Sequence, residues 1–288
     1  MPELPEVETT RRGLLPLVGN TVKSVTIRHP TLRWPIPQQL IDILPNRKLF
    51  TLKRRAKYIL CEFAAETETP SDKIISNQNS GGVLLLHLGM SGRICLLDAN
   101  YPPEKHDHFD IEFNDGQVLR LRDPRRFGAV LWIDNKNNDH VLLNSLGPEP
   151  LENDFNAKYL HKTLATKSLA IKNAIMDGHV VVGVGNIYAS ESLFRACIHP
   201  ETSAKKLSLT KCERLVKEIK STLNDALDAG GSSLRDFFGT DGNPGYFQQS
   251  YFVYARTGEP CKVCSNPIKC IRLGQRSTFY CEKCQKRL

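Results

Sequence analysis

Two different hydrophobic periodicities divide the chain. Between residues 21 and 133, short apolar segments alternate with polar positions or form brief buried runs. A period of two residues is typical of half-buried strands, and the Asn-Asp-Gly sequence at 114–116 is typical of a hairpin turn. Eight short, locally connected strands favour an antiparallel β-sandwich. We predict these strands at residues 22–28, 49–52, 58–63, 83–88, 93–97, 109–114, 117–121 and 129–133.

Beyond the Leu-Gly-Pro-Glu-Pro sequence at 146–150, the apolar positions recur with the period of a helix. We expect flexible loops at 241–245, which is rich in glycine, and at 66–82, a polar stretch that reads as a mobile surface insertion. Pro5 suits the first turn of a further helix that precedes the strands. The predicted helices are 5–15, 156–164, 171–177, 187–196, 210–229 and 233–238.

Four cysteines near the C-terminal end have the spacing of a metal site. Cys261 and Cys264 form one Cys-x2-Cys pair, and Cys281 and Cys284 form another after 16 intervening residues. This spacing predicts a closed tetrahedral site for one structural Zn²⁺ ion in a short finger built on a β-hairpin. Zinc alone does not indicate nucleic acid, because many zinc ribbons only stabilise a fold.

Charge and composition narrow the class of protein. The 288 residues carry a formal net charge of +8 and a sequence pI of about 9.0, which favours a polyanionic partner. Residues 251–288 hold eight Lys or Arg against two Glu, a balance of +6. No apolar run approaches the about 18 residues of a membrane span, and the acidic start does not resemble a signal peptide. Nine cysteines with four in a metal pattern fit a reducing cytosol.

The chain begins Met1-Pro2-Glu3. Removal of the methionine would leave Pro2 as a secondary amine, and a terminal amine has a reference pKa of about 7.7–8.0. Such an amine can attack a carbon electrophile and form an iminium, and Glu3 beside it could move the proton. Many proteins start Met-Pro without using the amine, so Pro2 alone is weak evidence.

Three further segments offer groups for nucleic-acid binding. Lys57 ends a basic run that leads into a strand, and an edge strand with solvated charges is the simpler interpretation. The Asp-Pro-Arg-Arg-Phe-Gly loop at 123–128 presents Arg125 beside Phe127, which could enter a helix gap or anchor in a core. Met90, between two glycines, could be a second apolar wedge or plug the core.

Two glycine-containing segments could bind phosphate. Asn186 follows Val-Gly-Val-Gly and could cap a helix and bind an anion, although the spacing is not that of a dinucleotide-binding fold. Arg276 lies at a predicted hairpin turn between the two cysteine pairs, where a guanidinium suits a phosphate.

Together these segments resemble the bacterial formamidopyrimidine-DNA glycosylases. The resemblance runs through nearly the whole chain, in the order PELPEVET, RRAKY, HLGMSG, KHDH, DPRRFG, LGPEPL, VGVGNIYASE, DGNPGYF, VYARTGEPC and QRSTFYC. Leu4 favours this branch over the endonuclease VIII enzymes, which usually start PEGPE. The departures are the 66–82 insertion, Asn173 in place of an expected proline, and the additional Cys270.

The resemblance implies a monomeric base-excision-repair enzyme that removes oxidised purines from damaged double-stranded DNA and then cleaves the strand as a lyase by β,δ-elimination. The lesion would be flipped out of the stack. Pro2 would attack C1′ and form a Schiff base, Glu3 would transfer protons at the sugar, and Lys57 would assist β-elimination or clamp a phosphate. Arg276 would donate the δ-elimination proton by family assignment, but a guanidinium pKa above about 12 makes phosphate anchoring the better role.

The resemblance also implies the DNA contacts. Met90, Arg125 and Phe127 would fill the vacated stack, with Arg125 facing the orphaned cytosine, and residues 239–247 would close over the flipped base. His106, Lys167, Lys172 and Asn186 would lie at the DNA backbone or near the lesion.

The implied organisation is α+β with three parts. These are a catalytic N-terminal helix plus β-sandwich at 1–146, a helix–two-turn–helix domain with the lesion loop at 147–250, and the zinc finger at 251–288. We expect the protein in the bacterial cytosol, associated with the nucleoid when it is bound to DNA. Two alternatives remain: a zinc-containing DNA-binding protein without catalysis, and an endonuclease VIII-like enzyme for oxidised pyrimidines.

Overall fold

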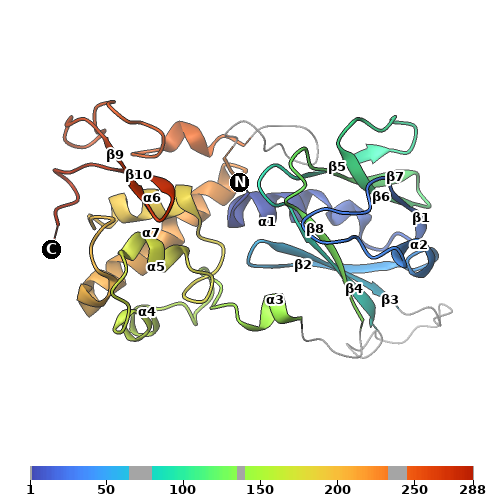
Figure 1. The fold of residues 1–288 in the computed structure, drawn as a ribbon, viewed down its shortest axis with the longest axis horizontal. Coiled ribbons are helices and arrows are strands. Elements are labelled where there is room, and N and C mark those ends of the chain that lie inside the picture. The colour runs from blue at the N-terminus through green and yellow to red at the C-terminus, as the bar shows by residue number, and fades with distance from the viewer. Residues whose placement is uncertain (1, 65–79, 135–139, 233–244, 288) are drawn as a thin grey trace. The chain divides into compact units, whose positions relative to one another are not determined.

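The computed structural model describes residues 2–64, 80–134, 140–232 and 245–287 and divides into two compact units. The first unit comprises Met1–Asn144 and Gly230–Gly245, and the second comprises Ser145–Ala229 and Tyr246–Leu288. Figure 1 labels the helices and strands of both. The finer division at residues 146 and 250 stays a prediction.

The first unit contains two four-stranded sheets in which every neighbouring pair is antiparallel. One has the order β1-β6-β7-β5 and the other β2-β3-β4-β8. All eight strands predicted from the alternation are therefore confirmed. Their bounds are β1 (Val22–Ile27), β2 (Leu49–Arg55), β3 (Tyr58–Ala64), β4 (Ser80–His87), β5 (Arg93–Asp98), β6 (Asp107–Phe113), β7 (Gln117–Arg122) and β8 (Ala129–Ile133).

Both sheets contribute side chains to one hydrophobic core. Phe63 of β3 and Phe109 of β6 are 0 % exposed within the same cluster, and Val7 of helix α1 (Leu4–Gly13) joins them. Complete burial of such a side chain is worth about 1.5–3 kcal/mol. The predicted sandwich is thus confirmed, with α1 packed on it as the resemblance implied.

The structure differs from the predicted elements in small details. Strand β4 begins at Ser80, so its first three residues lie inside the segment 66–82 that we predicted as an insertion, and residues 66–79 of that segment lie outside the described ones. The start of this strand was not predicted because glycines replace apolar residues where it meets Trp132: a Cβ on Gly82 would lie 2.1 Å from the indole. Two single-turn helices, α2 (Leu40–Ile43) and α3 (Val141–Asn144), were not predicted.

The second unit packs four longer helices around its own apolar core and adds a two-stranded hairpin. Asn156 accepts the N–H of Tyr159 at 3.0 Å and so caps the first of these helices. The prediction of a helix at 233–238 lies outside the described residues. The elements are α4 (Ala157–Leu164), α5 (Ile171–Met176), α6 (Asn186–Arg195), α7 (Leu209–Asp228), β9 (Lys269–Leu273) and β10 (Arg276–Tyr280), with 3₁₀ turns at Leu15–Leu17, Ala204–Lys206 and Phe247–Ser250 along the chain.

A buried carboxylate fixes the segment that leads into the hairpin. Glu191 of α6 is 0 % exposed and accepts the backbone N–H groups of Phe252, Val253 and Tyr254 at 2.8, 3.0 and 2.8 Å. Burial raises the pKa of Glu191, and the three N–H groups oppose that rise. The carboxylate therefore holds the chain between the helices and the finger.

Candidate functional site

The N-terminal segment is held from two sides. Pro2 and Glu3 are buried, and α1 begins directly after them at Leu4. Glu6 accepts the Glu3 N–H at 2.8 Å through Oε2, which is one half of a capping box. Its other oxygen, Oε1, accepts the N–H of Ser232 at 2.8 Å. The orientation of Pro2 is thus set by the first turn of a packed helix.

Lys57 lies in a two-residue turn that leads into β3. Ala56 and Lys57 connect β2 to β3, and Ala56 has a φ of +55°. Arg54 donates to the Ala56 carbonyl at 3.1 Å and lies 3.3 Å from Glu8 of α1, with only 13 % of its side chain exposed. The solvated-edge interpretation therefore fails for Arg54, which connects α1 to the turn that carries Lys57.

His87 lies at the end of β4, and the charge of Lys57 in this turn affects its pKa. Burial, together with the positive charges of Lys57 and Arg33, lowers the pKa of His87 to about 4. The neutral ring accepts the N–H of Gly89 at 3.0 Å through Nδ1. This hydrogen bond requires a lone pair on Nδ1, so it is compatible only with the unprotonated nitrogen.

Three side chains project from two neighbouring loops of the first unit. Met90 and Phe127 are 36 % and 44 % exposed, which excludes the alternative that either one plugs the core. The guanidinium carbon of Arg125 lies 4.8 Å from the centroid of the Phe127 ring, and Arg125 is exposed. We call Met90, Arg125 and Phe127 the wedge.

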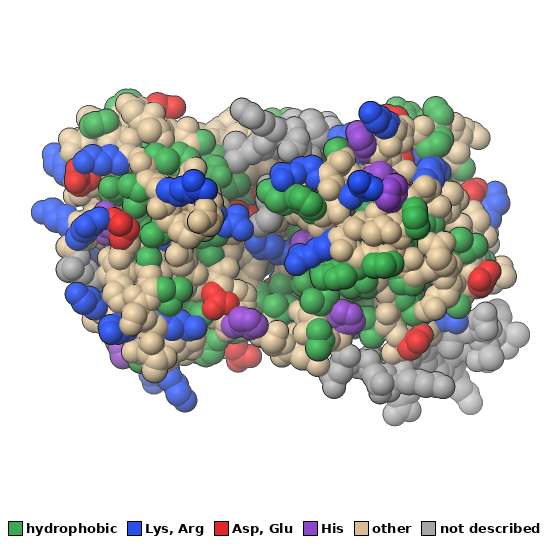
Figure 2. All heavy atoms as spheres, viewed as in Figure 1, with side chains coloured by type: hydrophobic (Ala, Val, Ile, Leu, Met, Phe, Trp, Pro, Cys, Tyr) green, Lys and Arg blue, Asp and Glu red, His purple; other side chains and the backbone are tan. Residues whose placement is uncertain are grey.

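His106 precedes β6 in the same unit. Its ring is half-buried and lies 6.3 Å from the ring of His108, edge to face. Figure 2 shows Lys, Arg and His side chains beside hydrophobic ones on the visible face. Such a mixture suits a partner with charged phosphates and apolar base faces.

In the second unit, Lys172 and Asn186 form one buried polar cluster with the finger hairpin. Lys172 is 0 % exposed, and its Nζ donates to Asn186 Oδ1 at 2.5 Å, Thr278 Oγ1 at 2.7 Å and the Ser277 carbonyl at 3.2 Å. Asn186 Nδ2 also donates to that carbonyl at 3.0 Å. The predicted capping role of Asn186 is wrong, because Gly185 occupies the N-cap position and the amide bonds to the finger instead.

Two further cations of this unit were singled out from the sequence. Arg276 is exposed, and Lys167 is half-exposed. Arg276 opens β10 after a turn in which Gly274 and Gln275 have φ values of +55° and +62°, as a type I′ hairpin requires. Lys167 Nζ lies 3.7 Å from Asp177 with 30 % of its side chain exposed. The predicted hairpin position of Arg276 is confirmed.

The four cysteine sulfurs form a compact cage. All lie within 4.8 Å of one another, with Cys261 and Cys284 at 3.9 Å and Cys264 and Cys281 at 3.4 Å. Zn–S bonds of about 2.3 Å place tetrahedral sulfurs about 3.8 Å apart, so the cage fits Zn²⁺. Four thiolates leave no position for a reacting water, and the site is therefore that of one structural zinc ion.

Several buried polar residues of the site were missed from the sequence. Glu6 had a local signal, since Glu3 and Glu6 have the spacing of a capping box. The partners of Arg54, Ser91, Asp123 and Glu191 could not be assigned from sequence alone. Within the described part of the chain, no helix is both long and apolar enough to cross a bilayer.

Almost the whole length of the chain matches known protein families. Three family models match: the formamidopyrimidine-DNA glycosylase N-terminal domain at residues 1–130, the H2TH domain of the same enzymes at 146–238, and the zinc finger found in FPG and IleRS at 258–287. The formamidopyrimidine-DNA glycosylase of Methylobacillus flagellatus is 60 % identical over 286 residues, covering 99 % of this chain and 97 % of its own.

Solved structures of such glycosylases are similar to this chain over almost its whole length. A complex of MutM with DNA containing carbocyclic 8-oxo-G has a TM-score of 0.86 and 34 % identity and covers 99 % of this chain and 100 % of its own. A complex of Lactococcus lactis Fpg with DNA containing Fapy-dG has a TM-score of 0.86 and 32 % identity, with the same coverage. With three matching domains and a full-length relative, the chain belongs to the formamidopyrimidine-DNA glycosylase family.

Proposed function

We propose that this protein excises oxidised purines, such as 8-oxoguanine and formamidopyrimidines, from duplex DNA and then cleaves the strand at the abasic site. The observation that carries the proposal is the combination, within one unit, of a terminal proline fixed by α1 and an exposed wedge. The relatives support the substrate class, since solved family members hold 8-oxo-G and Fapy-dG in DNA.

Pro2 is the nucleophile of this reaction. With Met1 removed, its nitrogen lone pair forms a bond to C1′ of the damaged nucleotide as the glycosidic bond breaks, and the base leaves with the electron pair of the glycosidic bond and takes up a proton. Opening of the sugar ring then gives an iminium between Pro2 and C1′. The capping box around Glu3 and Glu6 holds the amine in place.

Glu3 and Lys57 handle the protons. The Glu3 carboxyl group is buried next to Pro2 and protonates the sugar oxygen as the ring opens. Lys57, in the turn that Arg54 connects to α1, assists loss of the C2′ proton in β-elimination or binds the neighbouring phosphate.

The wedge fills the space that the flipped nucleotide leaves. Flipping costs a few kcal/mol of stacking and pairing, and apolar and guanidinium groups inserted in the gap offset that cost. Arg125 faces the orphaned base. Most of the predicted lesion loop at residues 239–247 lies outside the described residues.

The remaining cations bind or position the backbone. His106, Lys167 and Arg276 contact phosphates, in keeping with their exposure. The burial of Lys172 and its three protein acceptors argue against the predicted direct phosphate contact. We assign Lys172 and Asn186 to the positioning of the hairpin that carries Arg276.

The zinc ion stabilises the finger and takes no part in the chemistry. The protein acts as a monomer on damaged double-stranded DNA, in the bacterial cytosol where that DNA lies. Bacterial relatives support this location.

The test is borohydride trapping on a duplex with 8-oxoguanine opposite cytosine. Reduction of the iminium should leave the DNA covalently attached to the peptide that begins with Pro2, and Pro2→Gly should sharply reduce both trapping and strand cleavage. Trapping on Lys57 would overturn the assignment of the nucleophile. Binding without any adduct or cleavage would favour a DNA-binding protein without catalysis.

A further inference from the structure

The two loops that carry the wedge touch through their backbones. Gly89 precedes Met90 and has a φ of +62°, and a Cβ there would lie 2.3 Å from the Phe127 carbonyl carbon and 2.5 Å from the Gly128 nitrogen. A Cβ on Gly128 would lie 2.8 Å from the His87 carbonyl oxygen. Only glycine fits these positions, and the two loop backbones therefore lie in direct contact.

Asp123 and Ser91 add side-chain contacts across the same boundary. The Ser91 hydroxyl donates to Asp123 Oδ1 at 2.7 Å and accepts the Arg125 N–H at 3.2 Å. The second oxygen, Oδ2, accepts the Gly128 N–H at 2.8 Å. Asp123 is 0 % exposed and Ser91 7 %, which protects both hydrogen bonds of the carboxylate from water.

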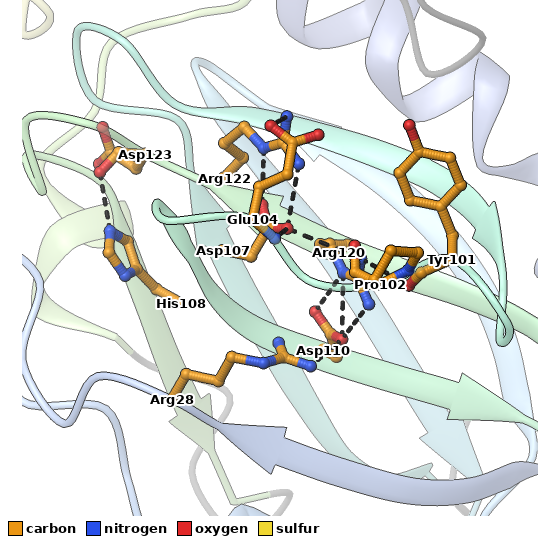
Figure 3. Close-up of polar contacts among 10 residues, drawn as sticks. All are labelled: Arg28, Tyr101, Pro102, Glu104, Asp107, His108, Asp110, Arg120, Arg122 and Asp123. Carbon is orange, nitrogen blue, oxygen red and sulfur yellow. Dashed lines mark hydrogen bonds and ion pairs between the residues drawn. The ribbon is translucent and has the colours of Figure 1, made fainter.

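The backbone of Asp123 reaches the segment that carries His106. Its N–H donates to the His106 carbonyl at 3.0 Å, and its own carbonyl accepts from His108 Nε2 at 2.9 Å. Figure 3 shows this contact beside the ion pairs of the same sheet. In that sheet Arg122 binds Asp107 at 2.6 and 3.0 Å, and Arg120 binds Asp110 at 2.9 to 3.1 Å. Asp123 therefore directly follows a strand, β7, that ion pairs join to β6.

We propose that Asp123 and Ser91 are positioning residues that lock the Met90 loop to the Arg125–Phe127 loop, so that the wedge enters DNA as a single rigid body. Both side chains are buried and so are not available to contact DNA. A rigid wedge loses less conformational entropy on insertion than three independent side chains would, so more of the contact energy remains to part the bases. The inference rests on the proposed function only in one respect, namely that the wedge inserts into DNA where the flipped nucleotide has left.

The first test measures backbone amide hydrogen exchange in the free protein. Ser91→Ala removes the hydroxyl from both partners, and the matched control Ser24→Ala removes a hydroxyl that donates to Glu112 at 3.1 Å in the same unit. We expect exchange to quicken by about tenfold in peptides from both loops, as for one lost hydrogen bond to a charged group, and to stay unchanged in the control. Faster exchange in residues 88–92 alone would overturn the proposal.

The second test compares two DNA substrates in single-turnover reactions. Ser91→Ala should slow excision of 8-oxoguanine from a duplex by about tenfold but leave cleavage of a preformed abasic site in single-stranded DNA unchanged, because no bases need parting there. A general loss of structure would slow both reactions. Ser91→Thr, which keeps the hydroxyl, should restore the duplex rate, and Asp123→Asn should reproduce the loss.

A double-mutant cycle separates the two proposals. If the loops act as one body, Ser91→Ala should slow duplex excision by less than about twofold once Phe127→Ala is present. Equal slowing in both backgrounds would overturn the lock. If Phe127→Ala alone has no effect on excision, the proposed function of the wedge fails, and the exchange measurement still decides whether the loops are locked.

Discussion

Glu6 and Ser232, 226 positions apart, are joined by a 2.8 Å hydrogen bond from the Ser232 N–H to Glu6 Oε1. The same carboxylate holds the Glu3 N–H. Gly231, whose φ is +84°, passes so close that a Cβ would lie 3.2 Å from Oε1. One buried carboxylate thus couples the N-terminus, which carries the proposed nucleophile, to the segment that leads towards the proposed lesion loop.

This coupling predicts that Glu6→Gln impairs catalysis without unfolding the protein. The amide keeps one acceptor oxygen but turns a donor towards a backbone N–H. We expect the rate of borohydride-trapped adduct formation to fall by about tenfold or more, since a hydrogen bond to a charged group is worth about 1.5–3 kcal/mol. Arg12→Gln, on the exposed side of α1, is the control. Equal trapping rates for the two variants would contradict the prediction.

Zinc binding by the four cysteines should stabilise the whole finger hairpin. Cys264→Ser or chelation should release the metal, unfold the hairpin and weaken DNA binding, and with it catalysis, because the finger is folded by its metal. Lys172 and Asn186 would lose their hairpin partners Ser277 and Thr278. Metal stoichiometry and DNA affinity are the measurements.

Cys270 provides a matched control for this experiment. It lies between the ligand pairs, is exposed and is outside the cage. Cys270→Ser should keep one zinc ion per chain and full affinity. A Cys264→Ser protein with the same properties would show that the cage is not the metal site.

The sequence revealed features whose signal is local. The strands alternate because one face of each sheet is buried, and the cysteine spacing is a property of two short turns. Asn186 was misread because the same residue type suits a helix cap and a bond to the Ser277 carbonyl, 91 positions away. Asp123 and Glu191 were missed because a buried carboxylate resembles an exposed one in sequence, and only the fold brings its donors together.

His87 should make stability depend on pH. Its pKa falls from 6.5 to about 4 on folding, so between these values the unfolded chain binds the proton and the folded one does not. The free energy of unfolding should therefore decrease as the pH falls through this window, by about 2 kcal/mol between pH 6.5 and about pH 5. His87→Gln should flatten that part of the urea-unfolding profile, whereas the exposed His161→Gln should not. Parallel profiles for wild type and His87→Gln would contradict the assignment.

Arg125 should determine which base is tolerated opposite the lesion. Its exposed guanidinium lies over the Phe127 ring and has only donors to offer. The pairing edge of cytosine offers such a group two adjacent acceptors, O2 and N3, whereas that of adenine offers the single acceptor N1 beside the N6 donor. Discrimination matters because excision of 8-oxoguanine opposite adenine would fix a mutation. Arg125→Ala should reduce the preference for cytosine over adenine opposite the lesion, measured from the excision rates, by about 1–3 kcal/mol.

The neighbouring Arg126 is the control for this prediction. Its Nη1 contacts His29 Nε2 at 2.5 Å, and its backbone has a φ of +57°, so its side chain is committed to a different contact. Arg126→Ala should leave the ratio of rates between opposite bases unchanged, because a side chain bonded to His29 does not read the orphaned base. Single-turnover rates on duplexes with each of the four opposite bases decide between the two outcomes. A ratio that is unchanged in Arg125→Ala would mean that the orphaned base is read by another residue.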